Sequence, residues 1–227
     1  MNSIVEVSNL HFKYPTRDKA TLQIPHFQIQ KGEKVFLFGP SGKGKTTFLE
    51  VLSGILIPTG GRVQVLGQNL AELSASGRDH FRGLHLGYIF QSFNLIPYLT
   101  VRENIELPIR LLKHNEKVVA NLSSNIKDFS ERLGIAEILG ESVTELSVGQ
   151  SQRVAVARAL VGQPQLILAD EPTSSLDSDH REKFIRLLFE LCDKSNISVL
   201  FVSHDRSIEK LFSRSVSLEE INRAGQI

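Results

Sequence analysis

The sequence predicts an α/β protein with a mostly parallel sheet, an antiparallel β portion near the N-terminus and an inserted helical lobe. Four short apolar runs predict buried strands: Lys34–Phe38, Leu86–Phe90, Gln165–Asp170 and Ser198–Ser203. Continuous apolar strands that alternate with helices are typical of a parallel sheet covered on both faces. Earlier in the chain, alternating apolar residues predict further strands, which we interpret as antiparallel.

These elements belong to one domain, residues 1–227. The antiparallel strands are expected at Ile4–Leu10, Leu22–Ile29 and Gly61–Gly67. Helices are predicted at Lys45–Ser53, Arg102–Lys113, Val118–Leu133, Gly149–Val161, Ser178–Asp193 and Arg206–Phe212. Because residues 92–159 are poor in strands, we assign them to the helical lobe, and we assign residues 1–91 and 160–227 to the α/β core.

Charge and composition disfavour several classes of protein. The 227 residues include 26 basic and 25 acidic side chains, a net charge of +1, which argues against a dedicated nucleic-acid binder. No run approaches the ~18 apolar residues of a membrane helix, and the N-terminus lacks the pattern of a signal peptide. The one cysteine, Cys192, lies in an apolar stretch, so we expect a buried, inert thiol and a reducing cytoplasm.

A glycine-rich stretch follows the first buried strand and opens a helix. Residues Gly39 to Thr46 match the spacing G-x-x-x-x-G-K-[ST] of a phosphate-binding loop. Lys45 would reach the β and γ phosphates, and the Thr46 hydroxyl would be offered to Mg²⁺. Lys43 either adds charge near the phosphates or remains a solvated lysine. We expect a RecA-like P-loop NTPase core that binds ATP through Gly39, Pro40, Ser41, Gly42, Lys43, Gly44, Lys45, Thr46 and Thr47.

An acidic pair ends another buried strand, in the run LILADEP. Asp170 is expected to hold the Mg²⁺ shell, and Glu171 is expected to polarise the attacking water. The alternative is an acidic pair that merely caps a strand. The phosphate-binding loop elsewhere in the chain favours the metal and catalytic roles.

Five further motifs occur in the order found in one family. They are Tyr14 in FKYP, Gln91 ending LGYIFQ, LSVGQ at Leu146–Gln150, SSLD at Ser174–Asp177 and His204 in FVSHD. With the phosphate-binding loop and the acidic pair, they resemble the nucleotide-binding subunit of an ATP-binding cassette (ABC) transporter over nearly the whole chain. The resemblance implies that Tyr14 stacks on adenine, that Gln91 is a catalytic and Mg²⁺-binding glutamine, and that His204 reads the γ-phosphate.

Each of these residues also has a plainer interpretation. Tyr14 could be a core or edge aromatic, with Phe12 nearby as a competitor for the base. Gln91 could merely end a strand, and His204 could be a satisfied loop histidine. Asp177 could cap the helix that begins at Ser178, contact nucleotide, or do both.

The same resemblance implies that ATP lies between two copies of the chain. The start of the LSVGQ helix, with Ser147, Gly149 and Gln150, would receive the γ-phosphate bound by the loop of the second copy. Val148 stands where the family commonly has glycine. We expect a negative φ there, which a β-branched residue tolerates.

The stretch His80–Ile109 resembles a particular branch, the ATPases of lipoprotein-release and macrolide or peptide export systems. This implies a separate membrane permease with few helices and a large periplasmic domain. The subunit would then be cytoplasmic and peripheral on the inner face of the membrane, with no appended regulatory domain. We expect the permease to dock on the apolar segment Ser92–Ile105.

Four functions are open to a chain with these motifs. The first is a transport ATPase that dimerises on ATP and drives a permease, and the second is a non-transport switch that regulates a membrane partner, as in cell division. A soluble ABC protein acting on ribosomes or DNA usually has two cassettes or a long coiled-coil insertion, which this chain lacks. A small-molecule P-loop kinase does not explain LSVGQ or SSLD. The sequence therefore favours the transport ATPase.

Overall fold

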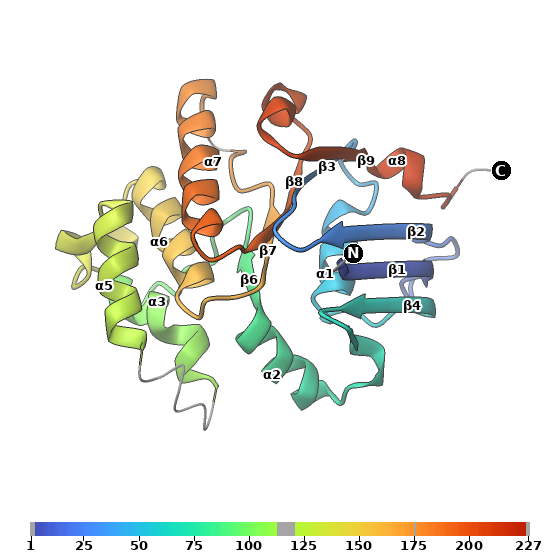
Figure 1. Cartoon of the computed structure of the whole chain (residues 1–227), viewed down its shortest axis with the longest axis horizontal. Coiled ribbons are helices and arrows are strands. Elements are labelled where there is room, and N and C mark those ends of the chain that lie inside the picture. The colour runs from blue at the N-terminus through green and yellow to red at the C-terminus, as the bar shows by residue number, and fades with distance from the viewer. Residues whose placement is uncertain (1–2, 113–120, 175, 226–227) are drawn as a thin grey trace.

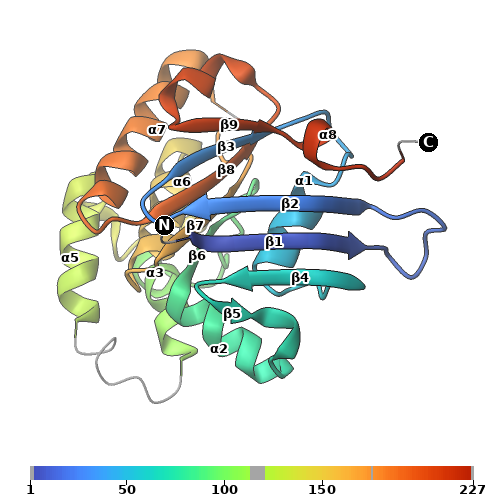
Figure 2. The same cartoon turned by 45° about the vertical axis from the view of Figure 1, so that its right-hand side comes forward.

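The computed structural model describes residues 3–112, 121–174 and 176–225. The first sheet is antiparallel, with the order β2–β1–β4–β5. Its strands are β1 (Ser3–Phe12), β2 (Leu22–Gln30), β4 (Gly60–Val65) and β5 (Gln68–Asn69). This sheet forms one end of the molecule in Figures 1 and 2, and it confirms the antiparallel β portion expected from alternating apolar residues.

The second sheet is parallel throughout, with the order β6–β7–β8–β3–β9. Its strands are β3 (Lys34–Phe38), β6 (Leu86–Ile89), β7 (Leu166–Asp170), β8 (Ser198–Ser203) and β9 (Arg214–Ser217). Parallel strands end at the same edge of a sheet, so the segments that follow β3, β7 and β8 meet there. That edge holds the phosphate-binding loop, the acidic pair and His204.

The helices surround the parallel sheet. They are α1 (Lys45–Leu52), α2 (Ala75–His85), α3 (Val101–Arg110), α5 (Leu122–Leu133), α6 (Val148–Leu160), α7 (Ser178–Asp193) and α8 (Leu218–Ile221). Short 3₁₀ turns lie at Leu70–Glu72, Ala136–Ile138, Val143–Glu145 and Arg206–Leu211. Where a helix was expected at Val118–Leu133, α5 begins at Leu122 with Asn121 as its N-cap, and residues 118–120 lie outside the described part. The expected helix at Arg206–Phe212 is a 3₁₀ turn.

Two hydrophobic cores lie on opposite faces of the parallel sheet. Along β3, Phe36 belongs to the core shared with α3, α5, α6 and α7, whereas Val35 and Leu37 belong to the core shared with α1 and the antiparallel sheet. All three side chains are fully buried. Side chains of a strand alternate between faces, so a strand buried on both sides is apolar throughout. This explains why the continuous apolar runs were correctly predicted as parallel strands.

The helical lobe is joined tightly to the sheet. Helices α3, α5 and α6 gather beside it (Figure 1), and α6 also packs on β6. A side chain at Gly87 of β6 would place a Cβ only 2.3 Å from the carbonyl oxygen of Ala159 in α6. The absence of a Cβ at Gly87 therefore permits this close approach. Helix α6 packs against both the helices of the lobe and strand β6 of the core. The lobe boundaries 92–159 therefore stay a prediction.

Helix α2 and strand β9 are among the described elements that the sequence analysis missed. Helix α2 has no buried residue, so its sequence lacks the apolar stripe that marks a packed helix. Strand β9 is four residues long and alternates polar side chains with one valine. It adds to the edge of the sheet beside β3. Both elements owe their place to tertiary pairing rather than to a local apolar pattern.

Candidate functional site

The phosphate-binding loop connects β3 to α1. Gly42 and Gly44 have φ values of 76° and 100°, a region that favours glycine. Gly44 is the residue that precedes α1, and no side chain caps the helix there. Backbone N–H groups at the start of α1 are therefore available to an anion. Gly39 has no positive φ, so its conformation alone does not require glycine.

Lys45 is the buried cation of this loop, with a relative exposure of 5%. Its Nζ donates hydrogen bonds to the carbonyl oxygens of Gly39 and Pro40 at 2.9 and 3.1 Å. The same Nζ lies 3.3 Å from a carboxylate oxygen of Glu171. A buried charge needs such partners. The loop thus holds the ammonium group in place by two carbonyls and one carboxylate.

Asp170 ends β7 and is buried next to the loop. Burial raises the pKa of its carboxyl group, and the charge of Glu171 acts in the same direction, while a hydrogen bond from Thr46 and the charge of Lys45 oppose the shift. Hard oxygen donors such as this carboxylate and the Thr46 hydroxyl suit Mg²⁺. Among the described residues, no group of three or more His, Cys, Asp or Glu side chains forms a protein metal cage. This donor set fits an ion that is also held by phosphate and water.

Glu171 and His204 form a pair at the edge of the sheet. His204 Nδ1 lies 2.8 Å from Oε2 of Glu171, and the other carboxylate oxygen faces Lys45. The Glu171 side chain is 13% exposed, whereas that of His204 is 55% exposed. Glu171 has a φ of 45°, uncommon for a residue other than glycine. Such outliers often lie at functional sites, and here the backbone aims the carboxylate between Lys45 and His204.

A cavity of about 340 Å³ opens over the phosphate-binding loop. Its lining brings together nine residues expected from the sequence: Tyr14, Ser41, Gly42, Gly44, Lys45, Thr46, Thr47, Gln91 and Glu171. Tyr14 is half-buried, and its hydroxyl lies 3.1 Å from Oγ1 of Thr47. Arg17 and Thr21 also line the cavity and were missed by the sequence analysis. They lie in the polar segment before β2, which has no motif of its own.

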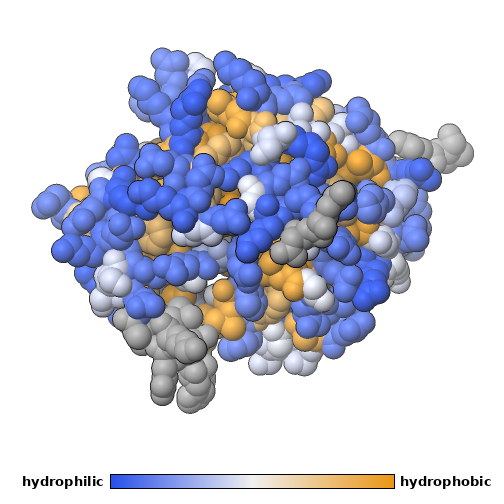
Figure 3. Space-filling model, viewed as in Figure 1, coloured by the Kyte–Doolittle hydropathy of each residue, from blue (hydrophilic) through white to orange (hydrophobic). Residues whose placement is uncertain are grey.

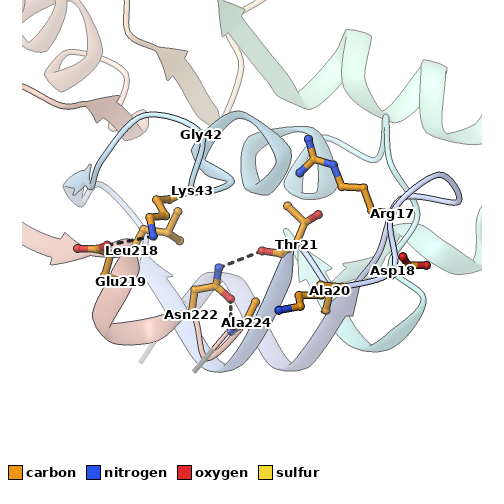
Figure 4. A pocket seen from close by; sticks show the side chains of 12 residues that line it. Arg17, Asp18, Ala20, Thr21, Gly42, Lys43, Leu218, Glu219, Asn222 and Ala224 are labelled. Carbon is orange, nitrogen blue, oxygen red and sulfur yellow. Dashed lines mark hydrogen bonds and ion pairs between the residues drawn. The ribbon is translucent and has the colours of Figure 1, made fainter. Parts of the chain in front are cut away.

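Lys43 points away from this cavity. It faces Glu219 at 3.8 Å, and it lines a neighbouring cavity of about 590 Å³ between the loop, residues 17–21 and the C-terminal segment. Figure 4 shows Lys43 beside Glu219, with the Arg17 guanidinium on the other side of Thr21. The solvated alternative for Lys43 therefore describes this structure. Gly39 and Pro40 contribute carbonyl groups to Lys45 rather than a cavity surface.

The N-terminal end of α6 is exposed to solvent. The Ser147 hydroxyl accepts a hydrogen bond from the Gln150 N–H, and the Gln150 side chain accepts one from the Ser147 N–H, which is a capping box. Val148 is 53% exposed and has no positive φ, which confirms the expectation for this residue. A Cβ at Gly149 would meet open space. None of these residues lines the cavity of the same chain, as far as the described residues show.

Asp177 caps α7. Its carboxylate accepts a hydrogen bond from the His180 N–H at 3.0 Å, and it also contacts the His180 ring. These hydrogen bonds lower the pKa of Asp177. The capping role expected from the sequence is therefore present. Ser175, the second serine of the SSLD motif, lies outside the described residues.

A third hollow, an apolar groove of about 350 Å³, lies between the α/β core and the helical lobe. Its lining includes Ile55 before β4, Tyr88 and Phe90 at β6, and Leu107 and Leu111 at the end of α3. In Figure 3 the visible face is mostly hydrophilic, and one of its small apolar patches lies between α2 and the end of α3. No residue of Ser92–Ile105 lines the groove, although that segment was expected to carry the docking surface.

Cys192 is fully buried in α7. Burial raises the pKa of its thiol to about 12. A thiol that stays protonated at neutral pH is a poor nucleophile. The expectation of an inert structural thiol is confirmed.

The parallel sheet and the glycine-rich loop between β3 and α1 define a P-loop ATPase. The sequence profile described as "ABC transporter" matches residues 22–174. The chain therefore belongs to the ABC transporter family, as the nucleotide-binding subunit that binds and hydrolyses ATP to drive a transporter. In the described part of the chain, no helix is both long and apolar enough to cross a membrane.

Curated relatives are similar to this chain over almost its whole length. A bacitracin export ATP-binding protein, BceA, of Halalkalibacterium halodurans is 36% identical over 96% of this chain and 86% of its own length. A lipoprotein-releasing system ATP-binding protein, LolD, of Bacteroides fragilis is 34% identical over 94% of this chain and 99% of its own.

Solved cassettes have the same fold. The dimeric ATP-binding cassette MJ0796 in a post-hydrolysis state with ADP and Pi has a TM-score of 0.83 and 32% identity, covering 94% of this chain and 93% of that one. CbiO1 of Clostridium perfringens, part of the transporter complex cbiONQ, has a TM-score of 0.83 and 26% identity over 96% of this chain and 85% of its own. These matches confirm the α/β fold class expected from the sequence.

Proposed function

We propose that Glu171 is the general base for ATP hydrolysis, oriented by His204 and, until nucleotide binds, by Lys45. The observation that carries this assignment is the chain of contacts Lys45–Glu171–His204 at the edge of the cavity. A carboxylate held between two nitrogen groups has a fixed direction, which a base needs to orient one water molecule. His204 is the more exposed partner, so it is placed to contact a γ-phosphate.

Phosphate binding would rearrange the contacts of Lys45. In the structure its ammonium group is held by two carbonyls and the Glu171 carboxylate. A triphosphate in the 340 Å³ cavity would offer stronger acceptors to the same group. Lys45 would then turn to the phosphates and leave a Glu171 oxygen free to accept a proton from water.

Asp170, Thr46 and Gln91 would hold Mg²⁺ in this site. Asp170 and Thr46 lie together, and Gln91 lines the same cavity from the end of β6. When bound, the ion neutralises charge on the phosphates. Tyr14 would support the adenine base, since its ring lies at the cavity and its hydroxyl contacts Thr47.

The complete site requires a second copy of the chain. The capped end of α6 exposes Ser147, Val148 and the N-terminal N–H groups, and it lines no part of its own cavity in the described structure. A helix N-terminus attracts anions. We therefore assign Ser147, Gly149 and Gln150 to the γ-phosphate on the partner, with Asp177 near the same interface. The dimer of the related cassette MJ0796 supports this arrangement.

The membrane partner is proposed to be a separate permease with few helices and a large periplasmic domain. The relatives named for bacitracin export and lipoprotein release support a branch that drives export or mechanical transport. The subunit would then be cytoplasmic and peripheral at the membrane. The apolar groove between the core and the lobe is the surface we assign to the permease.

The function is tested with purified chain and with its membrane partner. Affinity purification from native membranes should recover a permease, and adding that permease in lipid should change the ATPase rate. A Lys45→Ala variant should bind no ATP, because the phosphate charge is no longer balanced. Transport that survives loss of this subunit while cell division fails would favour the regulatory switch instead.

A further inference from the structure

The segment before β2 forms a tight turn at the edge of the nucleotide cavity. The N–H of Arg17 donates a hydrogen bond to the carbonyl oxygen of Tyr14 at 3.1 Å, across Pro15 and Thr16. This is a β-turn with proline at its second position, where the fixed φ of proline is favourable. The turn brings residue 17 back toward residue 14 and limits how far the two can separate.

The turn places a guanidinium over an aromatic ring. The Cζ atom of Arg17 lies 5.4 Å from the centroid of the Tyr14 ring. The ring itself is held from two other directions. Its hydroxyl contacts Thr47 in α1, and Phe12 packs against it in a T-shaped arrangement with centroids 4.9 Å apart. Tyr14 is therefore the fixed member of the pair, and the exposed Arg17 is the movable one.

We propose that Arg17 forms the second wall of the base-binding slot, with the purine ring of the nucleotide between Tyr14 and the Arg17 guanidinium. This inference rests on the proposed role of Tyr14. Two stacked layers at ordinary contact distance need about 7 Å between ring and guanidinium. The observed 5.4 Å requires a shift smaller than the length of the side chain. A planar guanidinium stacks well on aromatic faces, so the slot suits a flat base.

The guanidinium could contact the polyphosphate instead of the base, and the experiment must distinguish these two contacts. Arg17 lines both the nucleotide cavity and the neighbouring 590 Å³ cavity, so it could instead contact the polyphosphate. Figure 4 shows the guanidinium on the side of Thr21 away from Lys43. The Tyr14 ring beneath it favours the base. Inorganic tripolyphosphate provides the phosphate chain without a base and distinguishes the two contacts.

The test compares three variants by titration calorimetry with Mg-ATP and with Mg-tripolyphosphate. Arg17→Ala should weaken ATP about 3- to 10-fold and leave tripolyphosphate unchanged. Arg17→Lys keeps the charge but loses the flat face, so it should weaken ATP nearly as much. Lys19→Ala is the matched control, because Lys19 belongs to the same segment and lines only the neighbouring cavity. It should bind both ligands like the unmodified chain.

Two results would overturn the assignment. Equal weakening of ATP and tripolyphosphate in Arg17→Ala would show a phosphate contact, and unchanged ATP affinity would show no contact at all. A Tyr14→Ala variant shows whether only the assignment of Arg17 fails or whether the proposed role of Tyr14 fails as well. If Tyr14→Ala weakens ATP and Arg17→Ala does not, the slot has one wall. If neither does, the base lies elsewhere and the proposed role of Tyr14 is wrong as well.

Discussion

Glu171 is held between two basic side chains in a backbone conformation that few residues adopt. Its carboxylate contacts Lys45 and His204, and its φ is 45°. Removing the negative charge without changing the size should therefore affect catalysis more than binding. In Glu171→Gln, turnover should fall roughly 100-fold or more, in line with loss of a general base, while ATP still binds. Near-normal steady-state turnover would transfer the role to His204.

Asp170 gives the nucleotide-free protein a dependence of stability on pH. Burial raises the pKa of its carboxyl group above the ordinary value of 3.8, so the folded protein binds this proton more tightly than the unfolded chain. Asp170 therefore stabilises the fold fully at pH values below 3.8, and this stabilisation is lost as pH rises through the raised pKa of the folded state.

Asp170→Asn removes this dependence because the amide does not titrate. We expect the variant to have a higher melting temperature than the unmodified chain at neutral pH without nucleotide, and a smaller decline as pH rises from 4. Thermal unfolding followed by circular dichroism across that range measures both. If the variant is less stable at neutral pH, the contacts of the Asp170 carboxylate with Thr46 and Lys45 outweigh the cost of burying its charge. Mg²⁺-dependent ATP hydrolysis should be lost in either case.

At the scale of elements, α6 links the end that carries Ser147 to the loop behind Gln91. In its last turn, Arg158 donates hydrogen bonds to the carbonyl oxygens of Phe93 and Asn94, the Asn94 bond being 2.7 Å long. Burial lowers the pKa of Arg158 to about 10. Phe93 and Asn94 both have positive φ, at 58° and 47°. A buried guanidinium thus holds a strained turn directly after Gln91.

Replacing Arg158 should loosen that turn. Arg158→Met leaves two carbonyl groups without their donor, so we expect a loss of about 2 kcal/mol in the free energy of unfolding. Arg158→Lys keeps the charge but not the fork of donors, and it should lose less. Urea unfolding gives both values. If Arg158→Met is as stable as the unmodified chain, the hydrogen bonds contribute little and the turn is held by other contacts.

The cap of α6 allows the phosphate role of Ser147 to be separated from its structural role. Ser147→Asp keeps a favourable N-cap but places a negative charge where the partner's γ-phosphate would lie. Ser147→Ala removes the cap and adds no charge. We expect Ser147→Asp to bind ATP as a monomer with normal stability and to lose the ATP-dependent dimer. If Ser147→Asp dimerises like the unmodified chain, the capping box is only structural.

At the scale of the molecule, the apolar groove between core and lobe is the surface proposed for the permease. Leu111 is 72% exposed at its rim, whereas Tyr98 is 85% exposed and lines no part of it. Leu111→Arg should prevent co-purification of the permease and leave ATP binding by the isolated subunit intact. Tyr98→Arg is the matched control, an equally exposed change outside the groove. Loss of the complex in Tyr98→Arg alone would move the docking surface to Ser92–Ile105.

The parts of the fold that were predicted share one property, a local pattern. The interiors of Lys34–Phe38 and Ser198–Ser203 are continuously apolar because both faces are buried, and the bounds of these strands match the structure. Helix α2 and strand β9 lack such a pattern and were missed. Ser92–Ile105 does not line the apolar groove, because a run of apolar residues does not show which of them the fold buries. Phe93, for example, is 9% exposed.

The candidate site was predictable to the extent that its residues lie in motifs. Nine of the expected residues line one cavity although they come from four separate stretches of the chain. Arg17 and Thr21 were missed because their role depends on a turn that returns to Tyr14, which spacing alone does not reveal. Lys43, for which the sequence left two alternatives open, is the converse case. It lies within the motif, yet it faces Glu219 rather than the nucleotide cavity.

We expect ATP to complete its site only between two copies of the chain. Sedimentation velocity of Glu171→Gln with and without Mg-ATP tests it most directly, because slow hydrolysis preserves the closed state. We expect a monomer without ATP, a dimer with ATP, and a monomer with ATP when Ser147→Asp is added to Glu171→Gln. An ATP-saturated Glu171→Gln chain that remains monomeric at every protein concentration would show that ATP does not need a second copy.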